Sequence, residues 1–370
     1  EVTMYARLLI ATLLLTCPIF ASLAQLKTVP EIERATKSEF VKAVNDLRAF
    51  LQIPNDGHYP EQIDANISWA TKAFESRGFK TQLIKTPGAP HVYAEKQFVK
   101  KGKTVLFYLQ IDGQPVDTSA WDQESPFKAA LKEEKNGHWQ EIDWSNFNDN
   151  FNPDWRIYAR SASDSKGPAM CFLTALSILE KHKVKPNFNI KVIMDFQEEM
   201  SSPQLAWVVQ NNQELLKSDM VLIMDGTRHV SNLPTLCFGA RGIATATLKV
   251  YGPRNALHSG QYGNYAPNPV FAMSKLLAGL KDDMGRVTLP GFYDGITLSE
   301  ADKKDLNDIP EDMDEINATL GIARPDAVGA TYQEAMQYPS LNVRGIRAAW
   351  VGKEVRTIIP EEVIAEIDMR

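Results

Sequence analysis

Hydrophobic positions recur with helical spacing in some segments of the chain and form short apolar runs in others. The helical spacing predicts helices from a cap at Ser38 to about Leu51, from Pro60 to a terminating Gly78, over Lys166 to His182, and over Pro203 to Leu216. The apolar runs predict strands over Phe79 to Lys85, His91 to Glu95, Thr104 to Ile111, Asn189 to Phe196 and Asp219 to Met224. This order predicts an α/β fold with a mostly parallel sheet covered by helices.

The segment from Asp112 to Trp155 interrupts this pattern. It is rich in Asp, Asn, Trp and Pro, and it predicts a long loop or excursion. Long loops in compact domains are often functional.

The pattern changes again after Gly242. Strands are expected over Ile243 to Tyr251, Gly345 to Val351 and Val363 to Met369, with a helix over Ala266 to Leu280. This α+β pattern predicts a second domain, with a boundary near Gly239 to Gly242. We therefore expect a first domain over residues 25–240 and a second over residues 241–370.

Composition supports a folded protein that acts on small molecules. Of the 370 residues, 44% are hydrophobic and 23% are charged, which is ample for a core. The formal net charge of −6 gives no electrostatic footprint for nucleic acid.

The first 24 residues resemble a secretory signal peptide. Arg7 precedes an apolar run over residues 8–20, and small residues lead to a cleavage site after Ala24. This predicts a periplasmic or secreted protein with no membrane attachment after cleavage. Lipidation at Cys17 is the alternative.

Two cysteines remain after such cleavage, Cys171 and Cys237. Both have apolar neighbours, which favours buried free thiols. A single disulfide stays open as an alternative in an oxidising compartment.

Several polar residues follow the predicted strands directly. Gln110 and Asp112 close one strand, Glu198 and Glu199 a second, and Asp225 a third. Ligands gather at the carboxyl ends of the strands in parallel sheets. The sequence therefore predicts that these residues form one site.

Asp164 and the pair Glu198-Glu199 suggest metal-dependent chemistry. A carboxylate in the loop before a helix, such as Asp164, can bridge two divalent cations. Two adjacent carboxylates at a strand end can divide their roles, one as a ligand and the other as a general base. The alternatives are an N-cap role for Asp164 and a solvated acidic loop for Glu198-Glu199.

The motifs of the chain, taken in order, resemble the metallopeptidase family of carnosinase, aminoacylase and succinyl-diaminopimelate desuccinylase, in its carnosinase-like dipeptidase branch. The likeness runs from about Ser38 to Arg370. It rests on Asp112-Gly113-Gln114-Pro115-Val116-Asp117, Ser163-Asp164-Ser165-Lys166-Gly167-Pro168, Glu198-Glu199-Met200-Ser201-Ser202 and His258-Ser259-Gly260-Gln261-Tyr262-Gly263-Asn264.

The resemblance implies a role for each of these residues. Asp164 would bridge two divalent metal ions, zinc or else manganese or cobalt, and would precede a cis peptide bond. Glu198 would be the general base, Glu199 and Asp225 would each bind one ion, and Asp112 would orient the first ligand. The second domain would be an inserted lid and dimerisation domain. Its His258 would polarise the scissile carbonyl, typically across a homodimer interface, while Thr357 and Arg370 would contact a carboxylate-bearing dipeptide or N-acyl amino acid.

The sequence departs from the family pattern at two places. The family's first metal ligand is a histidine, and Gln110 stands in that position. We expect Asp112 to accept from the Gln110 amide and turn the amide oxygen toward the metal. The family also supplies a last histidine ligand after the lid, so we expect the chain to be part of a longer product.

Three functions compete on this basis. The first is a metal-dependent hydrolase that cleaves a peptide or N-acyl amide bond. The second is a catalytically impaired relative that acts as a binding protein, which Gln110 motivates. The third is a serine acyl enzyme, because Ser163 to Lys166 spells S-x-x-K, but the companion motifs of that class are absent.

Overall fold

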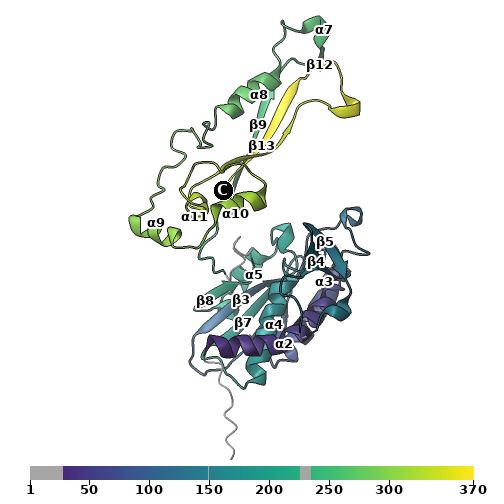
Figure 1. Ribbon diagram of the computed structural model, residues 1–370, viewed down its shortest axis with the longest axis vertical. Helices are drawn as coiled ribbons and strands as arrows, with labels where there is room; N and C mark the ends of the chain where they lie inside the picture. The colour runs from purple at the N-terminus through teal and green to yellow at the C-terminus, as the bar shows by residue number, and fades with distance from the viewer. Residues whose placement is uncertain (1–27, 149, 226–234) are drawn as a thin grey trace, which may run out of the picture. The chain divides into compact units, whose positions relative to one another are not determined.

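The computed structural model describes residues 28–148, 150–225 and 235–370 and divides the chain into two compact units, residues 1–226 and 227–370 (Figure 1). The domain boundary predicted from the sequence lies later in the chain, between residues 240 and 241. The proposed signal peptide lies outside the described residues. None of the described helices has the length and apolarity needed to cross a membrane.

Unit 1 is built on a mixed five-stranded sheet in the order β1-β2-β7-β3-β8. The strands are β1 Lys80–Ile84, β2 His91–Lys96, β3 Thr104–Gln110, β7 Asn189–Asp195 and β8 Met220–Ile223. Strand β3 pairs in parallel with β7 and β8, as expected. Strands β1 and β2 are antiparallel because a short connection joins them as a hairpin.

Helices cover both faces of this sheet (Figure 1). On one face, α2 (Val29–Leu51), α3 (Pro60–Glu75) and α4 (Lys166–Lys181) contribute Phe50, Phe74 and Leu173 to the main core. On the other face, α5 (Leu205–Asn211) and α6 (Gln213–Leu216) contribute Val208 and Leu216 to a smaller cluster. The sheet is therefore held between two apolar layers.

Two helix predictions needed correction. Helix α2 begins nine residues before Ser38, because Pro30 lies in its first turn and the Glu31 carboxylate accepts from Thr28 N at 2.9 Å. The helix expected over Pro203 to Leu216 is broken into α5 and α6 at Asn212, whose backbone leaves the helical region.

The segment from Asp112 to Trp155, expected as a long loop or excursion, holds most of a small antiparallel sheet that was not predicted. Its strands are β4 (Ala130–Lys135), β5 (His138–Ile142) and β6 (Arg156–Tyr158). Asn136 and Gly137 join β4 to β5 with φ of 54° and 78°. Two positive φ values are what a tight hairpin turn of this hand requires, and Asn-Gly adopts them readily.

Unit 2 is an α+β unit, as predicted. Its main sheet has the antiparallel order β11-β13-β9, with β9 Ala244–Tyr251, β11 Leu341–Arg347 and β13 Glu362–Met369. Alternate residues of β13 are buried, and Val363 and Ala365 pack with Met273 of α8 (Pro269–Ala278). The remaining elements of unit 2 are β10 Leu257–His258, α7 Ser259–Tyr262, α9 Glu300–Asn307, α10 Met313–Leu320, α11 Tyr332–Met336 and β12 Ile358–Ile359, with a short 3-10 turn at Gly352–Glu354. Unit 1 has short 3-10 turns at Thr118–Ala120, Trp144–Asn146 and Glu198–Met200.

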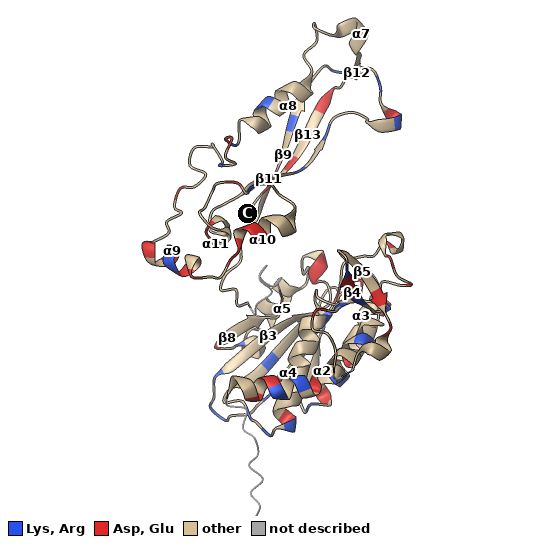
Figure 2. Ribbon diagram, viewed as in Figure 1, with Lys and Arg blue, Asp and Glu red and all other residues tan. Residues whose placement is uncertain are grey.

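Charged residues of both signs are interspersed on the surface elements. Figure 2 shows acidic and basic residues together on α9, where Lys303 pairs with Glu300 at 3.1 Å and Lys304 with Asp308 at 2.7 Å. Such exposed pairs contribute little to stability.

Both cysteines are exposed, so their predicted burial was wrong. The neighbours Met170 and Phe172 of α4 are buried. Successive helix residues point about 100° apart, so an apolar neighbour on each side does not place Cys171 in the core.

Candidate active site

The polar residues expected at strand ends lie at one edge of the unit 1 sheet. Gln110 is the last residue of β3, and Asp225 follows β8 by two residues. Glu198 and Glu199 lie in the 3-10 turn η3 (Glu198–Met200), directly after β7. Because β7, β3 and β8 are neighbours and run parallel, their carboxyl ends bring these side chains together.

Asp112 holds the turn that carries the two glutamates. Its Oδ1 and Oδ2 accept from the backbone N–H groups of Glu198 and Glu199, each at 3.0 Å. Burial raises the pKa of Asp112 to about 6 despite these two donors. One carboxylate thus fixes two successive peptide groups, and with them the starting points of the Glu198 and Glu199 side chains.

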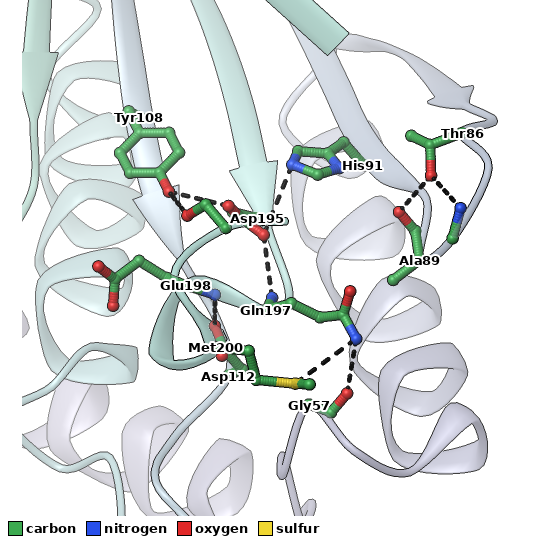
Figure 3. A network of polar contacts seen from close by, with 12 residues as sticks. Gly57, Thr86, Ala89, His91, Tyr108, Asp112, Asp195, Gln197, Glu198 and Met200 are labelled. Atoms are coloured by element: carbon green, nitrogen blue, oxygen red, sulfur yellow. Dashed lines mark hydrogen bonds and ion pairs between the residues drawn. The ribbon is translucent and has the colours of Figure 1, made fainter. Parts of the chain in front are cut away.

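A second carboxylate, Asp195, fixes the same turn from the side of the sheet (Figure 3). It is fully buried at the end of β7 and accepts from Tyr108 Oη at 3.0 Å and from Gln197 N at 2.9 Å. His91 Nε2 lies 3.5 Å from its Oδ1. Burial alone would raise the pKa of Asp195, but His91 and the hydrogen bonds together hold it below its usual value.

The loop before α4 packs tightly against the segment that follows β3. A Cβ on Gly113 would lie 2.2 Å from Ser161 Oγ, so only glycine allows this approach. Asn55 Nδ2 joins the two segments, donating to Ile111 O at 2.7 Å and Ser161 Oγ at 2.9 Å. Asp164 follows in this loop, and the Asp164–Ser165 peptide bond is cis, as the resemblance implied.

Asp164 does not cap α4, so the N-cap alternative does not hold. The N-cap position belongs to Ser165, and Ser165 Oγ lies 2.5 Å from Asp164 Oδ1. Lys166 next to it is fully buried, and its Nζ donates to Phe50 O at 3.0 Å and Ile53 O at 2.6 Å. Burial lowers the pKa of Lys166 to about 7. These two bonds tie the start of α4 to the end of α2.

Glu198 lies among carboxylates. Burial raises its pKa to about 7, and the charges of Glu199, Asp225, Asp112 and Asp164 add to the shift. A carboxyl group with a pKa near neutrality is suited to accept and return a proton. Burial also raises the pKa of Glu199, although Gln114 Nε2 donates to its Oε2 at 2.6 Å.

Gln110 is placed differently from the sequence expectation. Its Nε2 donates to Asp225 Oδ2 at 3.1 Å, and its Oε1 accepts from Ser165 Oγ at 3.0 Å. Asp112 accepts from the glutamate turn instead of the Gln110 amide. The expected geometry was wrong, because the Asp112 carboxylate is directed at the two backbone N–H groups of the turn and the Gln110 amide nitrogen is directed at Asp225.

The donor set fits a divalent cation in part. Asp164, Glu199 and Asp225 offer carboxylate oxygens, which suit hard and borderline cations, and their mutual repulsion favours a cation among them. Across residues 28–148, 150–225 and 235–370, no three His, Cys, Asp or Glu side chains are close enough to hold a metal as they stand. The Gln110 amide offers no negative charge and no ring nitrogen.

Unit 2 brings two of its three predicted residues together. Strands β10 and β12 pair His258 with Ile358, and Ser259 N donates to Thr357 O at 3.2 Å. Arg370 lies beyond the opposite end of β13, where its backbone pairs with Ser340. An eight-residue strand spans on the order of 25 Å, so Arg370 is remote from Thr357 within this unit.

Sequence reasoning missed three residues that shape the site. Asp195 was visible as a charged residue at the end of an apolar strand, which already suggests a paired buried carboxylate. Gln114 and Ser165 gave no such signal, because ordinary polar residues in loops are usually solvated. Their contacts depend on how distant segments pack.

Comparison with known proteins gives two family matches. Residues 106–233 match the model of peptidase family M20/M25/M40, and residues 238–370 match the peptidase dimerisation domain. The chain is 26% identical over 294 residues to a Beta-Ala-His dipeptidase of Rattus norvegicus, covering 78% of this chain and 55% of that protein. It is 28% identical over 274 residues to a Cys-Gly metallodipeptidase of Candida albicans, covering 72% and 52%. The chain thus spans about half the length of the curated relatives it matches.

Solved structures agree on the fold. An M20 family metallo-carboxypeptidase from Sulfolobus solfataricus has a TM-score of 0.67 and 29% identity, covering 89% of this chain and 70% of that one. Human carnosine dipeptidase 1 has a TM-score of 0.68 and 22% identity, covering 91% and 72%, and shows the fold alone.

Proposed function

From the premise that the chain belongs to the M20/M25/M40 peptidase family, we propose that it hydrolyses a peptide or N-acyl amide bond in a small substrate that carries a carboxylate. The observation that carries this proposal is the position of Glu198. It lies among four other carboxylates, with a pKa near 7, on a turn held by Asp112 and Asp195. The named relatives are dipeptidases, which supports a dipeptide as the substrate class.

In the proposed reaction, Glu198 takes a proton from the attacking water and passes it to the leaving amine. Bound divalent cations, zinc in first place, would polarise the carbonyl and lower the pKa of water. Asp164 and Glu199 would hold a cation, and Asp225 accepts a hydrogen bond from Gln110. Asp112 keeps Glu198 and Glu199 at a fixed separation through their backbone N–H groups.

His258 is the proposed donor to the developing oxyanion. Its Nδ1 accepts from Gly260 N at 3.1 Å. A neutral imidazole whose Nδ1 accepts must carry its proton on Nε2, so the ring presents Nε2–H as a hydrogen-bond donor. Thr357 beside it is a proposed substrate contact, and Arg370 is proposed to pair with the substrate carboxylate. Because Arg370 is remote from Thr357 within one unit, the two would come from different subunits of the proposed homodimer.

The match of unit 2 to a dimerisation domain supports a homodimer formed through this unit. Helix α8 exposes Phe271 at 72%, on the side of the helix away from the buried Met273, and Leu276 at 46% between the two. An apolar helix face of this kind is suited to a partner subunit.

The test is hydrolysis of a panel of dipeptides and N-acyl amino acids in the presence of zinc or manganese. We expect Glu198→Gln to lower kcat by a hundredfold or more, while Glu141→Gln, on the exposed strand β5, leaves it unchanged. Equal rates for the unaltered chain and Glu198→Gln would rule out the proposed base.

A second candidate function is a binding protein that has lost catalysis. Gln110 favours it, because an amide replaces the histidine of the family pattern and is held by Asp225 and Ser165. Metal analysis separates the two candidates, since a metal content near zero after saturation would favour the binding protein.

A further inference from the structure

The side chain of Gln110 is buried, with 4% exposed, and both ends of its amide are engaged. The nitrogen donates to Asp225 Oδ2 at 3.1 Å. The oxygen lies 3.0 Å from Ser165 Oγ, whose single proton it shares with Asp164 Oδ1 at 2.5 Å. The residue therefore links three segments: the end of β3, the stretch after β8 and the loop before α4.

Chemistry fixes which way this amide faces. An ionised carboxylate can only accept hydrogen bonds, and the amide nitrogen can only donate them. If the amide were turned over, its oxygen would lie against the Asp225 carboxylate, and two acceptors would repel each other. With no cation between the two side chains, the amide nitrogen must therefore face Asp225.

This orientation conflicts with a cation shared by residues 110 and 225. Such a cation needs a lone pair from each residue at about 2.0–2.2 Å. The amide nitrogen that faces Asp225 has no available lone pair, and its N–H points to the place where the cation would lie. A neutral imidazole in the same position has a ring nitrogen with a lone pair, so the conflict is particular to the amide.

The opposite side of the cluster differs in this respect. Gln114 also donates to a carboxylate, Glu199 Oε2, at 2.6 Å. Gln114 is exposed, however, so water can replace its contact when Glu199 turns to a cation. Gln110 is enclosed, so its amide could present the oxygen to a cation only by turning over in place and giving up its hydrogen bond to Asp225, with no water to replace that bond.

We propose that the Gln110 amide takes the place of a cation beside Asp225, so that the chain holds no more than one divalent cation per site. This inference deepens the proposed function and rests on its assignment of the carboxylate cluster as a metal site. The N–H of Gln110 partly compensates the charge of Asp225, which a second cation would otherwise do.

The experiment is equilibrium dialysis of the intact chain against zinc ions alone, with bound metal measured by elemental analysis. We expect no more than one zinc per unaltered chain, and one more in Gln110→His. The added ion should be lost again in Gln110→His combined with Asp225→Asn. Gln140→His, on the exposed strand β5, controls for adventitious binding by a new histidine.

Two results would overturn the inference. One is two zinc ions bound by the unaltered chain. The other is a folded Gln110→His, checked by circular dichroism, that binds no more zinc than the unaltered chain.

If Gln110→His does not fold, the zinc stoichiometry of Asp225→Asn alone tests the proposal. The stoichiometry should stay at the unaltered value, and a loss of one ion would contradict the proposal. The measurement needs no activity, so a chain that binds one zinc but hydrolyses nothing would refute the proposed function and leave this inference standing.

Discussion

Glu198 and Asp195 lie three residues apart, yet their surroundings act on their charges in opposite ways. Glu198 faces other carboxylates, and its pKa is raised to about 7. Asp195 faces a histidine, a tyrosine hydroxyl and a backbone N–H, and its pKa is lowered. The turn thus joins Asp195, whose charge is stabilised by the fold, to Glu198, whose ionisation costs free energy in the fold. Such strongly shifted carboxyl groups are typical of catalytic sites.

The raised pKa of Glu198 has a consequence for stability. The folded state binds the proton more tightly than the unfolded state, whose pKa is the usual 4.5. The cost of ionising Glu198 is therefore absent below pH 4.5 and grows as the pH rises through about 7. We expect Glu198→Gln to raise the melting temperature at pH 8 in chelator and to leave it nearly unchanged at pH 4. An equal shift at both values would contradict this account.

Asp195 should behave in the opposite sense, because removing its charge leaves buried partners unsatisfied. We expect Asp195→Asn to lower the free energy of unfolding by about 3 kcal/mol, measured by urea denaturation at pH 7. The pair of the exposed His58 with the partly buried Asp56, at 2.7 Å, is the control, and His58→Ala should cost less than about 1 kcal/mol. Similar losses of unfolding free energy in the two variants would show that the buried contacts of Asp195 do not stabilise the fold.

At the scale of elements, hydrophobic periodicity predicted the sheet of unit 1 and the three helices α2, α3 and α4 that cover one of its faces. The strands over Thr104–Gln110 and Asn189–Asp195 were recognisable because they are buried on both faces and nearly continuous in apolar residues. The small sheet was missed because its strands are largely polar, as in Lys132 to Lys135, and because the Asn136-Gly137 turn signal was given no weight.

The site was predictable to the same extent. Positions at strand ends follow from the chain order, so Asp112, Glu198 and Asp225 could be placed together from the sequence. The hydrogen bonds of Gln110 and Asp112 could not be predicted from the sequence, because each acceptor has several possible donors and the sequence does not show which of them lies within hydrogen-bond distance. That choice is made by packing between segments distant in sequence, such as residues 110 and 225.

The edge strand β8, predicted only as a strand, exposes an apolar surface. Met220, Val221, Leu222 and Ile223 are exposed at 56%, 55%, 36% and 63%. Apolar edge strands of this kind promote pairing between chains. We expect Val221→Lys to reduce species larger than the dimer in light scattering at rising concentration. Gln82→Lys, on the opposite edge strand β1, should have no such effect, and equal behaviour of the two variants would contradict the prediction.

At the scale of the whole molecule, each of the two units carries part of the residues proposed for hydrolysis. Unit 1 carries the carboxylates and the proposed base, and unit 2 carries His258 and Thr357, brought together by β10 and β12. This division agrees with the two family matches, one for each unit.

The proposed reaction makes one requirement, that hydrolysis needs both a divalent cation and Glu198. It is tested most directly by removing metal with a chelator, restoring zinc or manganese, and measuring both bound metal and dipeptide hydrolysis in the unaltered chain and in Glu198→Gln. We predict that both proteins regain the same amount of metal and that only the unaltered chain regains hydrolysis. Hydrolysis that survives in the chelator, or that returns equally in Glu198→Gln, would contradict the account.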